Sequence, residues 1–177
     1  MFLAVVLVGN IAAGTPTDYR FPGPYKFGSD TLSQTAETTA FAHWVRTNLG
    51  RNANIATDRF TAVALTGKAD AITPLQVPGL PLAGIWYNPR PPQPQLLYAM
   101  RQVGTRYLAL DMRDAHHASI VAPLFVPGLP DYVPERNLTR LAHWPWLHLL
   151  YSSAHYRLYR IDYHTYFIWY PFHAEDQ

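Results

Sequence analysis

The chain has 177 residues, of which 49% are apolar and only 15% are charged. This length fits one domain, and the low charge predicts extensive burial or an apolar face that meets a partner or a membrane. Its 14 basic and 12 acidic residues give a net charge of +2 without a basic cluster, so no nucleic-acid partner is predicted. The absence of cysteine excludes disulfides, thiolate catalysis and cysteine-ligated metals.

Residues 1–14 begin with an apolar run, Phe2 to Val8, that is far shorter than a bilayer span of ~20 residues. The run also lacks the basic start of a signal peptide. Two interpretations remain, the end of a transmembrane helix or a buried strand, and we favour the helix. Residues 15–177 are then expected to form a single α/β domain.

Alternating apolar patterns predict the elements of the first two-thirds of the chain. Apolar side chains at helical spacing, such as Phe41, Trp44 and Val45, indicate a helix that ends before Gly50. In chain order we expect a helix at 31–49, a strand at 53–58, a helix started by Asp58, a strand at 82–88, a helix at 96–104 and a buried strand at 106–112.

The last third is expected to add a short helix near 138–141 and a hairpin of strands 146–153 and 156–162. The aromatic stretch at 165–172 is either a last strand or a docking tail. Strands that alternate with helices favour an α/β fold, with a mostly parallel central sheet flanked by helices. The hairpin would add a C-terminal antiparallel edge.

Two carboxylates are the candidate catalytic residues. Asp58 and Asp111 each end an expected strand. If these strands are parallel neighbours, both carboxylates lie at the sheet edge where open α/β sheets bind ligands, and the pair could perform acid–base work. The alternative is that each aspartate caps the helix or loop that follows it.

The stretch from Asp111 to His117 resembles a metal site, because it holds Asp111, Asp114, His116 and His117. A metal needs three or four ligands that converge at ~2 Å, whereas adjacent histidines point in different directions on regular elements. We therefore predict no metal. No cofactor is predicted either, since the glycine-rich phosphate-binding motifs and the GxSxG nucleophile motif are absent from the sequence.

Aromatic side chains supply candidate binding residues. Trp86, Tyr87, Trp144 and Trp146 could stack on a sugar, or they could belong to the core. The tail at 163–172 has the Tyr and Trp composition of a water–lipid interface, but it also fits a covered strand.

Several pieces of the chain, spread over about residues 15–162, share the order of a known family. They are FAHWVRTNLG with Trp44, NIATDR with Asp58, VGTRYLALD with Arg106 to Asp111, and LLYSSAHYRLYRI with Tyr151 and Tyr156 to Ile161. This order resembles the C-terminal extracytoplasmic domain of bacterial multi-pass membrane glycosyltransferases that use polyprenyl-phosphate sugars.

The resemblance implies a domain at the extracytoplasmic face of the cell membrane, partnered by the rest of a membrane-embedded chain. In that family the catalytic acids lie in an early loop between transmembrane helices, and no part of this chain matches that loop. The resemblance therefore implies an accessory or binding domain, with a glycan or lipid-linked sugar as a possible ligand. The alternative is a free-standing hydrolase or transferase that uses Asp58 and Asp111.

Overall fold

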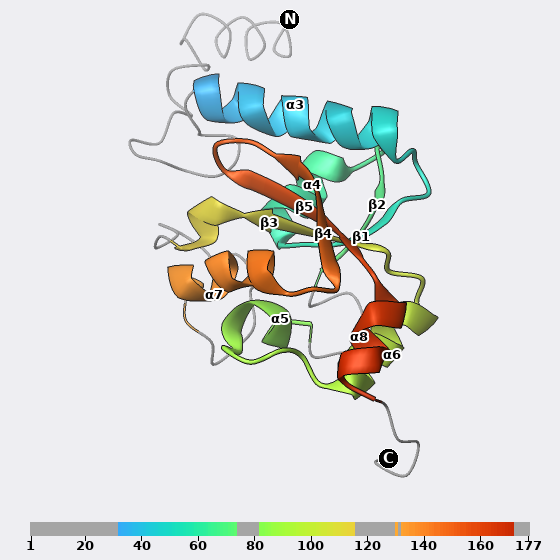
Figure 1. Ribbon diagram of the computed structural model, residues 1–177. Helices are drawn as coiled ribbons and strands as arrows, with labels where there is room; N and C mark the ends of the chain where they lie inside the picture. Colours follow the sequence, from blue (N-terminus) through green and yellow to red (C-terminus); the bar gives the residue numbers. More distant parts are fainter. Residues whose placement is uncertain (1–31, 74–81, 116–129, 131, 172–177) are drawn as a thin grey trace, which may run out of the picture.

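The computed structural model describes residues 32–73, 82–115, 130 and 132–171. The expectations for residues 1–14, His116 and His117 lie outside these residues. Figure 1 shows three layers, a central sheet with α3 and α4 on one side and α5 to α8 on the other. The α/β class is therefore confirmed.

The middle layer is a five-stranded sheet with the order β2-β1-β3-β5-β4. Strand β1 pairs in parallel with β2 and with β3, whereas β5 runs antiparallel to both β3 and β4. The strands are β1 (Asn54–Ala56), β2 (Asp70–Ile72), β3 (Tyr107–Asp111), β4 (Leu147–Ser152) and β5 (Tyr156–Ile161).

The expectation of a mostly parallel sheet is right for only one half of it. Helices connect β1 to β2 and β2 to β3, and such crossovers allow parallel pairing. The short turn between β4 and β5 imposes an antiparallel hairpin, as predicted. Because β5 rather than β4 pairs with β3, the hairpin supplies the whole antiparallel half of the sheet.

One face of the sheet is covered by α3 (Leu32–Asn48) and α4 (Arg59–Leu65). Both helices were expected from the sequence. Fully buried side chains of α3 pack on residues of three strands, and this cluster includes Phe41, Val45, Ile55, Ala109 and Leu158.

The other face is covered by shorter helices, which enclose a larger core. They are α5 (Gly84–Tyr87), α6 (Pro94–Gln102), α7 (Glu135–Arg140), the 3₁₀ turn η2 (Leu141–His143) and α8 (Tyr163–Trp169). A second 3₁₀ turn, η1 (Met112–Ala115), follows β3 directly. Leu108 and Leu110 of β3 face this core, whereas Ala109 between them faces α3, as strand alternation requires.

Two segments for which a strand was predicted or considered form helices. At 82–88 the chain forms α5, because Leu82, Ile85 and Trp86 have helical spacing and are all buried. Of the stretch expected to be a last strand or a docking tail, residues 165–169 belong to α8, which begins where the Asp162 carboxylate accepts a hydrogen bond from the Thr165 amide. The three-residue strand β2 was not expected, and its brevity explains why.

Helix α3 depends on Phe41, whose ring stacks on Tyr156 of β5 at 4.5 Å between centroids and 2° between planes. We expect Phe41→Ala to lower the free energy of unfolding by about 3–5 kcal/mol, because it leaves a cavity between α3 and the sheet. Urea denaturation measures this. His43→Ala, at an exposed position of the same helix, should change stability by less than about 0.5 kcal/mol. Equal effects of the two substitutions would contradict this packing.

Candidate functional site

The structure places Asp58 and Asp111 at the same edge of the sheet, as the sequence predicted. They follow or end β1 and β3, which are adjacent and parallel. Both are buried, with 0% and 1% exposure respectively. The ligand-binding edge of an α/β sheet therefore carries two carboxylates that bulk water does not reach.

Asp58 is the N-cap of α4. Its Oδ1 accepts hydrogen bonds from the amides of Phe60 at 2.8 Å and Thr61 at 3.0 Å. These amides belong to the first turn of the helix, where backbone donors have no intrahelical partner. The capping alternative considered for Asp58 is thus what the structure shows.

Asp111 forms a bidentate ion pair with Arg113, two residues along the chain. The Arg113 Nε lies 2.9 Å from Oδ1 and its Nη2 lies 2.8 Å from Oδ2. The Arg113 amide also donates to Oδ1, at 2.9 Å. Because both side chains are buried, each charge depends on the other for compensation.

Tyr156 joins this ion pair to the first helix. Its hydroxyl accepts a hydrogen bond from Arg113 Nη2 at 2.7 Å and lies 3.0 Å from Thr38 Oγ1 on α3. Burial raises the pKa of Tyr156, and the negative charges of Asp111 and Asp58 raise it further against the opposing effect of Arg113. The phenol therefore stays protonated at neutral pH and is available as a hydrogen-bond donor.

A second polar cluster adjoins the first on the surface. The Glu37 carboxylate of α3 accepts hydrogen bonds from Ser153 Oγ at 2.5 Å, the His155 amide at 2.8 Å and His155 Nδ1 at 2.6 Å. Burial of Glu37 opposes ionisation, but these donors outweigh it and lower the pKa of Glu37 to about 2. The cluster ties α3 to the turn between β4 and β5.

Serine, histidine and glutamate together resemble a hydrolase triad, yet their connections differ from one. In a triad the imidazole lies between the hydroxyl and the carboxylate and takes the hydroxyl proton. Here Ser153 and His155 both donate to the same carboxylate of Glu37. The serine proton is thus directed to Glu37 and not to an imidazole, and with a pKa of about 2 this carboxylate is a weak base for removing it.

The possible metal ligands are only partly within the described residues. Asp111 is committed to Arg113, and Asp114 is fully buried next to it. Among the described residues, no group of three His, Asp or Glu side chains has a geometry that could hold a metal ion.

The four aromatic candidates come together around α5 and η2. Trp86 and Trp146 are fully buried, so their rings pack in the core. Trp144 is partly exposed and is stacked on Trp146 at 4.9 Å, with the Arg140 guanidinium 5.0 Å from its ring centre. Tyr87 is also partly exposed and donates its hydroxyl to the Pro130 carbonyl at 2.7 Å. Of the four predicted glycan contacts, only Tyr87 and Trp144 have partly exposed side chains.

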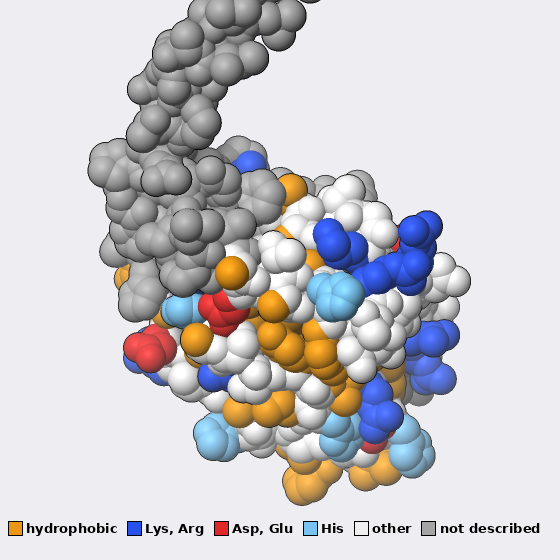
Figure 2. All heavy atoms as spheres, turned by 90° about the horizontal axis from the view of Figure 1, so that it is seen from above, with side chains coloured by type: hydrophobic (Ala, Val, Ile, Leu, Met, Phe, Trp, Pro, Cys, Tyr) orange, Lys and Arg blue, Asp and Glu red, His pale blue; other side chains and the backbone are white. Residues whose placement is uncertain are grey.

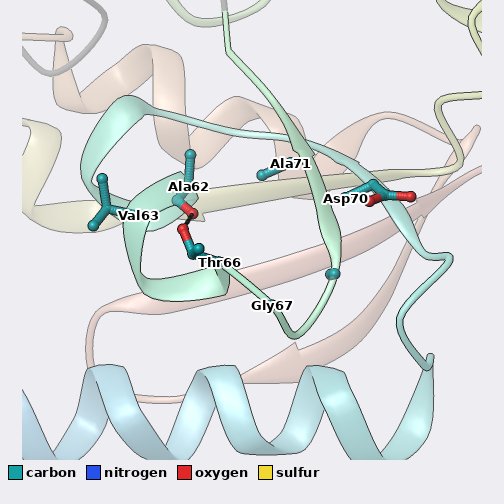
Figure 3. Close-up of a pocket in the computed structure, with 7 residues that line it drawn as sticks. Ala62, Val63, Thr66, Gly67, Asp70 and Ala71 are labelled. Atoms are coloured by element: carbon teal, nitrogen blue, oxygen red, sulfur yellow. Dashed lines mark hydrogen bonds between the residues drawn. The ribbon is translucent and has the colours of Figure 1, made fainter.

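An open hollow of about 360 Å³ lies between α4 and β2. Figure 3 shows the residues that line it. Alanine is the most frequent residue of its lining, with Thr66 and Asp70 as polar members, and in Figure 3 the Asp70 side chain points away from Thr66. Figure 2 shows apolar and charged side chains interspersed on the face that it displays. Among the described residues, neither the hollow nor this surface has a group of polar side chains that converge on one point, as a ligand site requires.

The long-range partners in these two clusters were not predictable from the sequence. Tyr156 and His155 lie more than 40 and 110 residues, respectively, from the groups they bind. The proximity of Arg113 to Asp111 was the one local signal, because a cation two residues beyond a strand-ending aspartate can fold back onto it.

The low pKa of Glu37 predicts a specific loss of stability in acid. Because folding lowers this pKa from 4.5 to about 2, its contribution is present above pH 4.5 and disappears as the pH falls toward 2. The gap in urea midpoint between wild type and Glu37→Gln should therefore be wide at neutral pH and close over that interval. Glu135→Gln, at an exposed site on α7, is the control and should follow wild type. A gap independent of pH would refute this role for Glu37.

Removal of one partner of the buried ion pair should be costly. Asp111→Ala leaves the Arg113 guanidinium without its bidentate carboxylate, and we expect a loss of about 3–5 kcal/mol in unfolding free energy. Asp70→Ala, at an exposed carboxylate of β2, should cost less than about 0.5 kcal/mol. A mild effect of Asp111→Ala in chemical denaturation would show that this pair does not support the fold.

Comparison of the chain with protein-family models and with curated proteins gave no match. Within the described residues, no helix is both long enough and apolar enough to cross a bilayer.

Proposed function

We propose that the chain is a non-catalytic accessory or binding domain of a bacterial membrane protein of the glycosyltransferase type, at the extracytoplasmic face of the cell membrane. One observation carries the non-catalytic part of the proposal. The two carboxylates at the ligand-binding edge are buried and engaged, Asp58 with helix amides and Asp111 with Arg113.

A general acid or base has to reach the substrate proton, directly or through one water. Asp58 and Asp111 are both buried, so using either one requires the edge of the sheet to open. That requirement favours the accessory role over a free-standing hydrolase or transferase.

The membrane assignment rests on the resemblance, which supplies the rest of a membrane-embedded chain as the partner. A glycan or lipid-linked sugar is the ligand class proposed. Tyr87 and Trp144 are the candidate contacts, because a partly exposed ring can stack on a sugar face. The chemistry itself would belong to other parts of the assembly.

The substitution Asp58→Asn distinguishes a catalytic role of this carboxylate from its role as a helix cap. Asparagine caps a helix about as well as aspartate but carries no charge, whereas Asp58→Ala removes the cap at a cost of about 1 kcal/mol. In membranes that contain the full-length protein, we expect Asp58→Asn to leave sugar transfer unchanged and Asp58→Ala to reduce only the amount of folded protein. Loss of transfer by well-folded Asp58→Asn protein would establish a catalytic role for this carboxylate.

A further inference from the structure

Helix α8 exposes apolar side chains where a surface helix normally exposes polar ones. Its inner face holds Tyr163, Tyr166 and Phe167, which pack against the core. On its outer face Ile168 is 67% exposed and Trp169 is 65% exposed, the highest values among the large apolar side chains of the described residues. A short helix that is apolar on both faces is unusual beside water.

The helix is held firmly in this position. The Tyr166 hydroxyl donates to the Pro92 carbonyl at 2.5 Å, and the Tyr163 hydroxyl donates to the Thr105 carbonyl at 2.7 Å. Figure 1 shows α8 next to α6, on the side of the sheet opposite α3. Ile168 and Trp169 are therefore presented by an anchored helix.

A cationic side chain, Arg101, and the imidazole of His164 lie next to these apolar side chains. A shallow hollow between α6 and α8 is lined by Arg101, Tyr163, His164, Phe167 and Ile168. None of the described residues that line it is acidic. An exposed arginine and a histidine beside protruding Ile and Trp side chains match the chemistry of an anionic lipid surface, with phosphates outside and acyl chains beneath.

We propose that the outer face of α8, with Arg101 and His164 beside it, docks on the surface of an anionic lipid bilayer. Ile168 and Trp169 enter the region between headgroups and acyl chains, while Arg101 meets lipid phosphates. A lipid surface is the occupant chosen because the positive charge of Arg101 is complementary to lipid phosphates. The inference rests on the proposed function in that this function places the domain beside a bilayer.

The absence of cysteine from the chain allows a direct test. Ile168→Cys in the full chain, labelled with an environment-sensitive fluorophore, is mixed with vesicles of phosphatidylcholine and phosphatidylglycerol. Val63→Cys, at a 53% exposed apolar position on α4, carries the same label as the matched control. We expect a blue shift and brighter emission at position 168 only, and a much smaller change with pure phosphatidylcholine.

Flotation with vesicles measures how much Ile168 and Trp169 contribute to the affinity for the bilayer. Ile168→Ser/Trp169→Ser should weaken vesicle binding by about tenfold or more, because two large apolar side chains no longer enter the bilayer. Arg101→Gln should reduce the preference for anionic vesicles. Vesicle binding without any response at position 168 would overturn the proposal, as would no binding at all. A label response that depends on protein concentration in the absence of vesicles would point to self-association and would also overturn it.

These outcomes are distinct from failure of the proposed function. Sugar transfer that is lost in Asp58→Asn protein would refute the non-catalytic role and leave lipid docking intact. Conversely, a chain that ignores vesicles could still serve as an accessory domain.

Discussion

A buried guanidinium requires a buried counter-charge, and the pairing of Arg113 with Asp111 meets this requirement at the end of β3. The same guanidinium donates to the Tyr156 hydroxyl, which in turn reaches Thr38 on α3. One network thus connects a parallel strand, the neighbouring antiparallel strand and the long helix above them. The stacking of Phe41 on Tyr156 adds an apolar contact at the same place. The position of α3 on the sheet depends on this combination of a satisfied ion pair and close ring packing.

The hydrogen bonds around Arg113 also affect whether this edge of the sheet can bind a ligand. In open α/β sheets this edge usually receives a ligand, because loops diverge there and leave a crevice. In this protein the carboxylates at that edge are engaged, Asp58 by the first turn of α4 and Asp111 by Arg113, whose guanidinium also donates to Tyr156. The neighbouring Glu37, Ser153 and His155 cluster fastens the hairpin to α3 with groups that elsewhere perform hydrolysis. Residue types that often serve catalysis stabilise the packing here, which supports the proposed accessory role.

Local pattern was sufficient for α3, the Asp58 cap, β3 and the β4–β5 hairpin, since each has a short-range signal such as helical spacing, a capping residue or a tight turn. It was misleading at 82–88 and did not identify the helix at 165–169, because short aromatic runs satisfy both strand and helix preferences and the core decides between them. The antiparallel half of the sheet arises because β5, and not β4, pairs with β3. This pairing depends on tertiary contacts, which no local pattern encodes. The placement of both aspartates was predictable from strand order. The hydrogen bond from Arg113 to Tyr156 was not predictable, because the two residues lie 43 positions apart in the sequence.

The claim that this polar edge holds the fold together is tested most directly by a double-mutant cycle between Arg113 and Tyr156. Arg113→Met, Tyr156→Phe and the double variant are compared with wild type by equilibrium urea denaturation. Because a hydrogen bond to a charged group contributes about 1.5–3 kcal/mol, we predict a coupling free energy of about 1–2 kcal/mol. Effects that add to within about 0.3–0.5 kcal/mol would contradict the account, since independent sites behave in that way.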